Sequence, residues 1–145
     1  MKLGSIKEEI EIEQRIAVTP ELIKKYKSLD LNIILSKGYG EHLGISDQEF
    51  IKEGAEMLDN DEKVLSNADV ILQMNLINEE NFEKLKKGQI LIGVLDPFSN
   101  KEKIKKLIDK NINCFSLELL PRITRAQSMD ILSSQANLAG YKAVV

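Results

Sequence analysis

The residues of this 145-residue chain that are best suited to chemistry lie together near its carboxyl end. They are Arg122, Gln127, Asp130 and Ser133. Arg122 offers a planar, permanently charged donor, Gln127 an amide that both donates and accepts, and Asp130 a carboxylate acceptor. This segment follows a β-rich run at residues 113–117 and leads into a helical pattern. It therefore follows the carboxyl end of a predicted strand, where open α/β sheets bind their ligands.

This set of donors and acceptors suits an anionic ligand that also carries an amide, such as a nicotinamide nucleotide. Arg125 offers a second guanidinium in the same run, but a salt bridge to a neighbouring acid explains that residue at least as well. One face of the helical stretch carries only small side chains, which would let a backbone or a ligand approach closely. These are Ser133, Ala136, Gly140 and Ala143. An ordinary surface loop followed by a packed helix explains the same residues, and spacing alone favours that simpler interpretation.

The rest of the chain alternates between predicted strands and predicted helices. The strands are predicted at residues 2–6, 32–35, 69–74, 89–95 and 113–117. This alternation predicts an α/β fold with a parallel sheet covered on both faces, a three-layer flavodoxin- or Rossmann-like domain. Because the run at 89–95 is continuously apolar, we expect it to be the longest strand, central and covered on both sides.

Local signals mark where the helices begin and end. Thr19 and Pro20 are typical of a helix start. Capping boxes are predicted for helices that begin after residues 46 and 99, and a further helix is predicted at 78–86. Buried stripes are predicted on the first and the fourth of these helices, and they include Leu29 and Ile108 respectively.

A glycine-rich stretch at residues 38–44 invites comparison with a dinucleotide-binding fingerprint. Its third glycine comes one residue too late for G-x-G-x-x-G, and the acid expected about 20 residues further on is missing. We therefore interpret these glycines as a turn at the mouth of the domain, so that the domain lacks a dinucleotide fingerprint of its own. His42, the single histidine, is expected to be a surface loop residue.

Composition limits the classes of function. With 43% hydrophobic and 30% charged residues, the chain has the balance of one soluble globular domain. A net charge of −3 gives no reason to expect binding to nucleic acid or to an anionic membrane. Neither a signal peptide nor a membrane-spanning stretch is predicted, so we expect a cytoplasmic chain. Cys114 is expected to be a buried structural thiol, and no metal site is predicted.

Two stretches carry a resemblance to a known family. The run PRITRAQSMDILSSQANLAGYKAV, residues 121–144, resembles the nicotinamide-contacting segment of proton-translocating NAD(P) transhydrogenases. It belongs there to the NAD-binding component, whose superfamily includes alanine dehydrogenase. The opening KEEIEIEQRIAVTPELIKKY, residues 7–26, is similar to the start of the same family. Lys7, Glu8, Arg15, Thr19 and Pro20 match the family's pattern there.

The resemblance implies a domain that works inside a larger enzyme. Members of the family fold as two α/β domains, and residues 1–145 resemble the N-terminal one, ending in a truncated linker helix. The NAD-binding Rossmann domain is absent, so the isolated chain is expected to be inactive. The implied reaction is hydride transfer from NADH to NADP⁺ on a partner component, coupled to proton translocation. The implied partners are the NADP-binding and membrane components. The whole protein is expected to be a dimer, cytoplasmic and peripheral to the inner membrane through its partners.

The same resemblance assigns the site residues. Arg122, Gln127, Asp130 and Ser133 are expected to bind and position the nicotinamide of NAD(H). Arg122 and Asp130 would supply charge near the ring and its ribose, and Ser133 a hydroxyl to the carboxamide. Gln127 and Asp130 are expected to influence the hydride transfer itself, with Gln127 reaching toward the second nucleotide.

Two alternatives remain open. The N-terminal domain of an alanine dehydrogenase shares the fold, but this resemblance would require a cationic clamp and a proton shuttle. The chain keeps the matching Arg15, yet it has Gln73 in place of a lysine and Asp96 in place of a histidine, which favours the transhydrogenase and leaves Arg15 a structural role. The second alternative is a binding or assembly fragment without catalysis.

Overall fold

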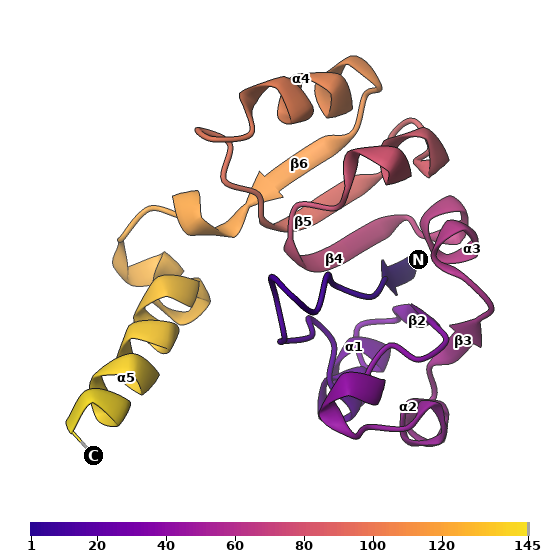
Figure 1. Cartoon of the computed structure of the whole chain (residues 1–145), viewed down its shortest axis with the longest axis horizontal. Coiled ribbons are helices and arrows are strands. Elements are labelled where there is room, and N and C mark those ends of the chain that lie inside the picture. Colours follow the sequence, from indigo (N-terminus) through magenta and orange to yellow (C-terminus); the bar gives the residue numbers. More distant parts are fainter. Residues whose placement is uncertain (145) are drawn as a thin grey trace.

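The protein is built on one six-stranded sheet in which every pairing is parallel (Figure 1). The structure is a computed structural model and describes residues 1–144. The strands are β1 (Lys2–Ser5), β2 (Asn32–Ser36), β3 (Glu56–Leu58), β4 (Val70–Asn75), β5 (Ile90–Val94) and β6 (Asn113–Ser116). Their order across the sheet is β3-β2-β1-β4-β5-β6. The predicted α/β class with a parallel sheet is confirmed.

Helices connect the strands and enclose two separate cores. The α-helices are α1 (Pro20–Lys27), α2 (Asp47–Glu53), α3 (Asp61–Asn67), α4 (Lys101–Asp109) and α5 (Ile131–Val144). Short 3-10 turns are η1 (Glu41–Leu43), η2 (Glu79–Lys84), η3 (Leu117–Leu119) and η4 (Thr124–Met129). One core lies where α3, η2 and α4 meet the sheet and includes Val64, Phe82 and Leu107. The other lies under α1 and α2 and includes Ile23 and Phe50.

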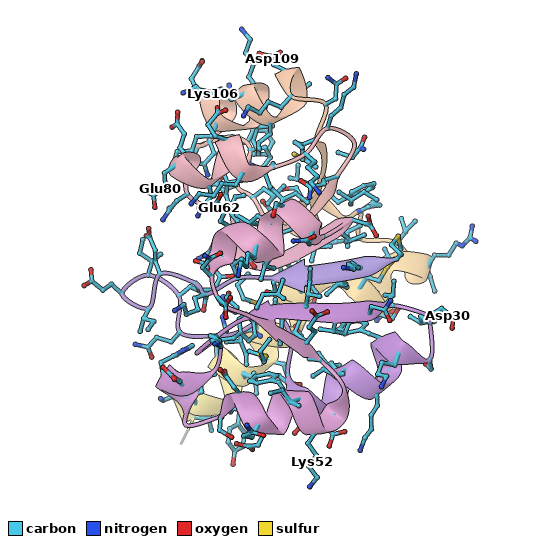
Figure 2. The ribbon with its side chains drawn as sticks, turned by 90° about the vertical axis from the view of Figure 1, so that its right-hand side faces the viewer. Asp30, Lys52, Glu62, Glu80, Lys106 and Asp109 are labelled. Atoms are coloured by element: carbon cyan, nitrogen blue, oxygen red, sulfur yellow. The ribbon has the colours of Figure 1, made fainter. Side chains whose placement is uncertain are left out.

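Charged side chains occupy the outer surfaces of these helices, as expected for the lysine pairs of the sequence. Figure 2 shows Lys52 and Lys106 extending outward from the body. None of the helices in residues 1–144 is both long and apolar enough to cross a membrane.

Helix capping agrees with the sequence at one site and differs at another. At Ser46 the predicted capping box forms, because Glu49 Oε1 accepts a hydrogen bond from Ser46 N at 2.9 Å. The box predicted at Ser99 is wrong. There α4 begins after Asn100, and Ser99 N donates to the Asp96 carboxylate instead. The aspartate that closes the preceding turn therefore takes the place of the predicted cap.

The sequence interpretation counted five strands and missed β3. This strand has only three residues and lies at the sheet edge, between the turn at Gly54 and the start of α3. So short a segment carries too few residues to show the alternation that marks a strand. The predicted helix at 78–86 is also wrong, because that segment forms the 3-10 turn η2 rather than an α-helix.

The prediction for residues 89–95 needs a further correction. β4 is the longest strand, and β5 lies next to the sheet edge rather than at its centre. β5 has neighbours on both sides, but only one of its faces is fully covered, because residues 90, 92 and 94 are half-buried and lie outside both cores. On the edge strand, Phe115 is 56% exposed. Both faces are therefore covered only in the β1–β3 half of the sheet.

Two residues assigned to buried helix stripes are exposed. Leu29 is 68% exposed because α1 ends at Lys27, so this residue lies beyond the helix. Ile108 is 59% exposed because it follows the buried Leu107, and successive positions of a helix point about 100° apart.

We predict that Gly93→Ala destabilises the protein by about 1–3 kcal/mol, because the new methyl group forces the crossing of β4 and β5 apart. A Cβ at Gly93 would lie 2.6 Å from the backbone oxygen of Gln73. Gly140→Ala is the matched control, since a Cβ there meets nothing within 4 Å. Urea unfolding followed by circular dichroism measures both. Equal stability of Gly93→Ala and the parent chain would contradict the prediction.

Candidate functional site

The strand order reverses at the centre of the sheet, between β1 and β4. From β1 the chain proceeds outward to β2 and β3, and it then returns to place β4 on the other side of β1. In open α/β sheets this reversal opens a crevice at the carboxyl ends of the two strands. The backbone pairing of β1 with β4 covers only Leu3 with Val70 and Gly4 with Ile71. Beyond these residues the two strands separate.

A buried glutamine side chain closes the gap between the separating strands. Gln73 Oε1 accepts a hydrogen bond from Ile6 N at 2.8 Å, and Gln73 Nε2 donates to Ile6 O at 3.3 Å. The primary amide thus pairs with one residue as a neighbouring peptide group would. Because Gln73 is 3% exposed, these bonds also satisfy an amide that would be costly to bury alone.

Tyr39 extends this network to the loop before α1. Ser5 Oγ donates to Gln73 Oε1 at 2.9 Å and lies 2.8 Å from the Tyr39 hydroxyl. That hydroxyl also accepts hydrogen bonds from Ala17 N and Val18 N. Burial raises the pKa of Tyr39 to about 12, against the lowering effect of these hydrogen bonds. The phenol is therefore neutral and can donate to Ser5 while it accepts from the loop.

Glu8 completes the network at its outer end. Its Oε1 accepts hydrogen bonds from Met74 N at 2.6 Å and from Gln73 Nε2 at 3.0 Å. Burial raises the pKa of Glu8 to about 7, although the backbone amides of Met74 and Asn75 act in the opposite direction. The carboxyl group is thus poised to change charge near neutrality.

Arg15 is paired within its own loop. Its guanidinium binds Glu13 in a bidentate arrangement, with Nε to Oε1 at 2.8 Å and Nη2 to Oε2 at 2.6 Å. Glu13 is 7% exposed, and the pKa of its carboxyl group is lowered chiefly by this side-chain hydrogen bond. Arg15 therefore holds the loop together, as the structural role expected from the sequence requires.

Two cavities lie on either side of Glu8. One, of about 610 Å³, is lined by residues 7–12 and His42. The other, of about 530 Å³, lies between this loop, the segment after β4 and the start of α4. Asp96, Asn100 and Lys103 line it. His42 is partly buried, and its Nε2 lies 2.8 Å from Gln14 O, so it anchors the loop.

The glycine-rich turn at 38–44 has no free phosphate cradle. Gly38 has φ of 73°, and its amide donates to the Asp47 carboxylate at 3.0 Å. A carboxylate therefore already occupies an amide that would have to face a phosphate. This geometry agrees with the interpretation of the stretch as a turn.

The segment predicted to bind a ligand lies outside this cleft. Residues 124–129 form the 3-10 turn η4, and α5 begins at Ile131, so the segment is more regular than the polar loop that the sequence suggested. Figure 1 shows α5 extending away from the sheet. In the described part of the chain, no residue of α5 is buried. The small-residue face of this helix is thus exposed rather than packed.

Asp130 and Ser133 are brought together at the start of α5. Asp130 Oδ1 accepts hydrogen bonds from Leu132 N and Ser133 N, both at 3.0 Å. Ser133 Oγ donates to Asp130 Oδ2 at 2.6 Å. The pKa of Asp130 is lowered, first by the Ser133 hydroxyl and then by the backbone amide of Ser133, with a smaller effect of Arg122. Asp130 is thus an ionised helix cap.

Arg122 and Gln127 are exposed on the same segment. Arg122 lies near enough to Asp130 to affect its pKa, whereas Gln127 contacts that residue only through its backbone oxygen, which accepts from Asp130 N at 3.4 Å. None of the cavities described above is lined by this segment. Three of the four predicted residues therefore lie together, and Gln127 stands at the preceding turn.

The sequence interpretation missed the joint role of Ser5, Tyr39 and Gln73. The signal was present, because Gln73 is the single polar residue in the apolar run DVILQM at residues 69–74. A polar side chain in the middle of a buried strand requires a partner, and that requirement pointed to a network.

Comparisons with known proteins agree with this geometry. The family model described as alanine dehydrogenase/PNT, N-terminal domain, matches residues 4–139. The first of the proteins that make up the NAD(P) transhydrogenase alpha subunit of Rickettsia prowazekii is 37% identical over all of this chain, which spans 39% of that protein. A crystal structure of transhydrogenase from Sinorhizobium meliloti matches with a TM-score of 0.92 and 40% identity, over 99% of this chain and 43% of that one. An L-alanine dehydrogenase shares the fold, with a TM-score of 0.76 and 17% identity.

We predict that Gln73→Met destabilises the protein by about 1–3 kcal/mol, because methionine fills the volume but leaves the amide and carbonyl of Ile6 without partners. Gln127→Met is the matched control. It makes the same substitution at an exposed position, where a surface change should stay within about 0.5 kcal/mol. Thermal unfolding of both variants beside the parent chain tests this. A Gln73→Met melt that coincides with that of Gln127→Met would show that the network contributes little.

Proposed function

Because the chain belongs to the family of alanine dehydrogenase/PNT N-terminal domains, we propose that it is the nicotinamide-facing domain of an NAD(P) transhydrogenase alpha subunit. The proposed reaction is hydride transfer from NADH to NADP⁺, coupled in the whole enzyme to proton translocation. The observation that carries the proposal is the exposed segment at residues 122–133, in a chain that matches transhydrogenases over its full length. That segment presents charge, an amide and a helix cap together.

In the proposed enzyme the nucleotides supply the chemistry, and the protein orients them and excludes water. The residues of the segment fit a nicotinamide and its ribose in chemical type. Arg122 brings a guanidinium, and Gln127 an amide that can both donate and accept. The Asp130 carboxylate and the Ser133 hydroxyl are fixed relative to each other by their 2.6 Å hydrogen bond. This fixed pair can position a ring more accurately than two free side chains.

The proposal requires parts beyond this domain. The chain spans about two fifths of the length of the transhydrogenase subunit that it matches. We propose that a Rossmann domain carries the pyrophosphate and that NADP(H) binds to a partner component. The assembly would be a dimer that reaches the membrane through its partners. The apolar half-open face of β5 and β6 and the exposed α5 would then pack against these parts.

The cleft at β1 and β4 favours a transhydrogenase over an alanine dehydrogenase. Arg15 is held by Glu13, so its guanidinium is not free to clamp a small carboxylate. Both polar atoms of the Gln73 amide are bound to the backbone of Ile6 and to its neighbours. At the third position of the alternative site, Asp96 is an acid whose amide donates to Glu118. This arrangement offers no cationic clamp for a 2-oxo acid.

We predict that this chain alone binds NADH only weakly, with a dissociation constant of about 1 mM or higher. The expected reason is the lack of a phosphate-binding helix terminus within the glycine-rich turn, where Asp47 already occupies the Gly38 amide. Isothermal titration calorimetry of the purified chain measures the constant. Low-micromolar binding would place a pyrophosphate site in this domain and would contradict the proposed division of roles.

The second prediction concerns Asp130→Asn in the reconstituted full-length enzyme. If the carboxylate orients nicotinamide, the change slows hydride transfer about ten- to a hundredfold, because one hydrogen bond to a charged group is worth about 1.5–3 kcal/mol. NADH affinity should change little, since most of it would come from phosphate and ribose contacts elsewhere. Stopped-flow transfer between bound NADH and an NADP⁺ analogue measures the rate.

The structure makes this variant a sharp test. Asparagine keeps an oxygen for the amides of Leu132 and Ser133, and asparagine and aspartate cap helices about equally well. A thermal melt should therefore be unchanged. Gln127→Asn in the same enzyme should also slow transfer. If Asp130→Asn transfers hydride at the normal rate, the aspartate is only a cap, and a chain that supports no transfer in any reconstitution would favour the non-catalytic alternative.

A further inference from the structure

The loop formed by residues 7–14, here the Glu8 loop, is attached to the body by a few polar contacts. Within the loop, Ile12 N and Glu13 N both donate to Glu9 O at 2.8 Å, so it forms a compact turn. Its attachments to other elements are made by Glu8 to β4, by Glu9 to Asn78 and by Gln14 to His42. Ile12, at 73% exposed, adds little apolar burial. The Glu8 contact is therefore a large part of what holds the loop.

The partner of Glu8 on β4 is unusual for a strand residue. The pairing of β4 with β5 shifts register between Leu72 and Asn75, so Met74 lies at a bulge. Its amide donates to Glu8 Oε1 at 2.6 Å. If the loop moves away, this amide faces the space between the two cavities that flank Glu8. The hydrogen bond of Met74 thus reports directly on whether the loop is closed.

Several charged groups act on the Glu8 carboxyl group. Burial disfavours its charge, and so does Glu13 from the far end of the same loop, whereas Arg15 favours it. Lys7 and Lys103 line the same cavity from the loop and from α4, and Asp96 lines it from the segment after β5. His42 faces the loop from η1. Burial has the largest effect of these, and it raises the pKa of Glu8 from 4.5 to about 7.

We propose that Glu8 is a proton-dependent contact that keeps the loop closed over the β1–β4 cleft when protonated and shifts it toward an open form when ionised. When the loop opens, the carboxylate returns to water, which removes the cost of burying its charge. The Met74 and Gln73 amides are then exposed to solvent through the joined cavities. Gln73 keeps its bonds to Ile6, so the sheet itself stays intact.

The sign follows from proton linkage. The closed loop holds the proton up to a pKa of about 7, whereas an open, hydrated carboxyl group loses it near 4.5. Between these values the closed form binds more protons than the open form, so rising pH favours opening. Closure is fully favoured below about pH 4.5, weakens through the interval and levels off above about pH 7. Function near neutral pH therefore falls where the loop responds most to a proton.

Amide hydrogen exchange of Met74 tests the proposal in the full chain. In the parent protein, the protection factor, already corrected for base-catalysed exchange, should fall about a hundredfold between pH 5 and pH 7 and then level off. In Glu8→Gln the fall should vanish, because the side-chain oxygen still accepts from Met74 but cannot ionise. Leu91 in the buried strand β5 is the internal reference.

Two controls separate Glu8 from its neighbours. Glu11→Gln removes an exposed acid of the same loop and should leave the fall in protection unchanged. His42→Gln removes the other titrating group that contacts the loop and should also preserve it. A protection factor that is flat with pH in the parent chain, or a fall that persists in Glu8→Gln, would overturn the proposal. So would a Glu8 carboxyl carbon that titrates near 4.5 by NMR.

Discussion

The structure depends on how the backbone is satisfied where β1 and β4 separate. A crevice at the switch point requires that two central strands part, but buried peptide groups cannot be left without hydrogen bonds. Gln73 resolves this conflict by pairing its amide with both polar groups of Ile6. Tyr39 and Ser5 continue the solution toward α1. The sheet can therefore open at this edge without losing its central pairing.

This solution uses donors and acceptors that a ligand would otherwise engage. A glutamine bound to backbone on both sides is a structural element and offers little to a substrate. The ionisable group of the cleft lies one step further out, at Glu8, and the residues proposed to face nicotinamide lie outside it, on residues 122–133. The domain thus separates a fixed centre from an adjustable edge. Such a separation suits a protein whose ligand is held largely by other parts of an assembly.

The sequence predicted the fold class because local signals were enough for it. Apolar runs separated by capping residues indicated a parallel sheet, and Ser46 with Glu49 forms the predicted box. β3 escaped because three residues at an edge carry no measurable period. The Gln73 network could not be predicted, since Ser5 and Tyr39 are distant in the sequence and meet only in the folded chain. Resemblance identified the residue types at 122–133, whose role in hydride transfer stays a prediction, and the structure added that Asp130 caps α5.

The distribution of apolar surface argues for the same division of labour. Parallel sheets are stable when both faces are covered, yet β5 and β6 are covered on one face, and Phe115 is left 56% exposed. On α5, Leu138 and Tyr141 are 62% and 74% exposed. Both exposed regions belong to the second half of the chain, whereas the β1–β3 half is closed on both sides. Apolar surface that is concentrated in this way marks a region of contact with other protein. A nicotinamide-facing segment that begins between these two regions would be fixed in place only when that contact forms.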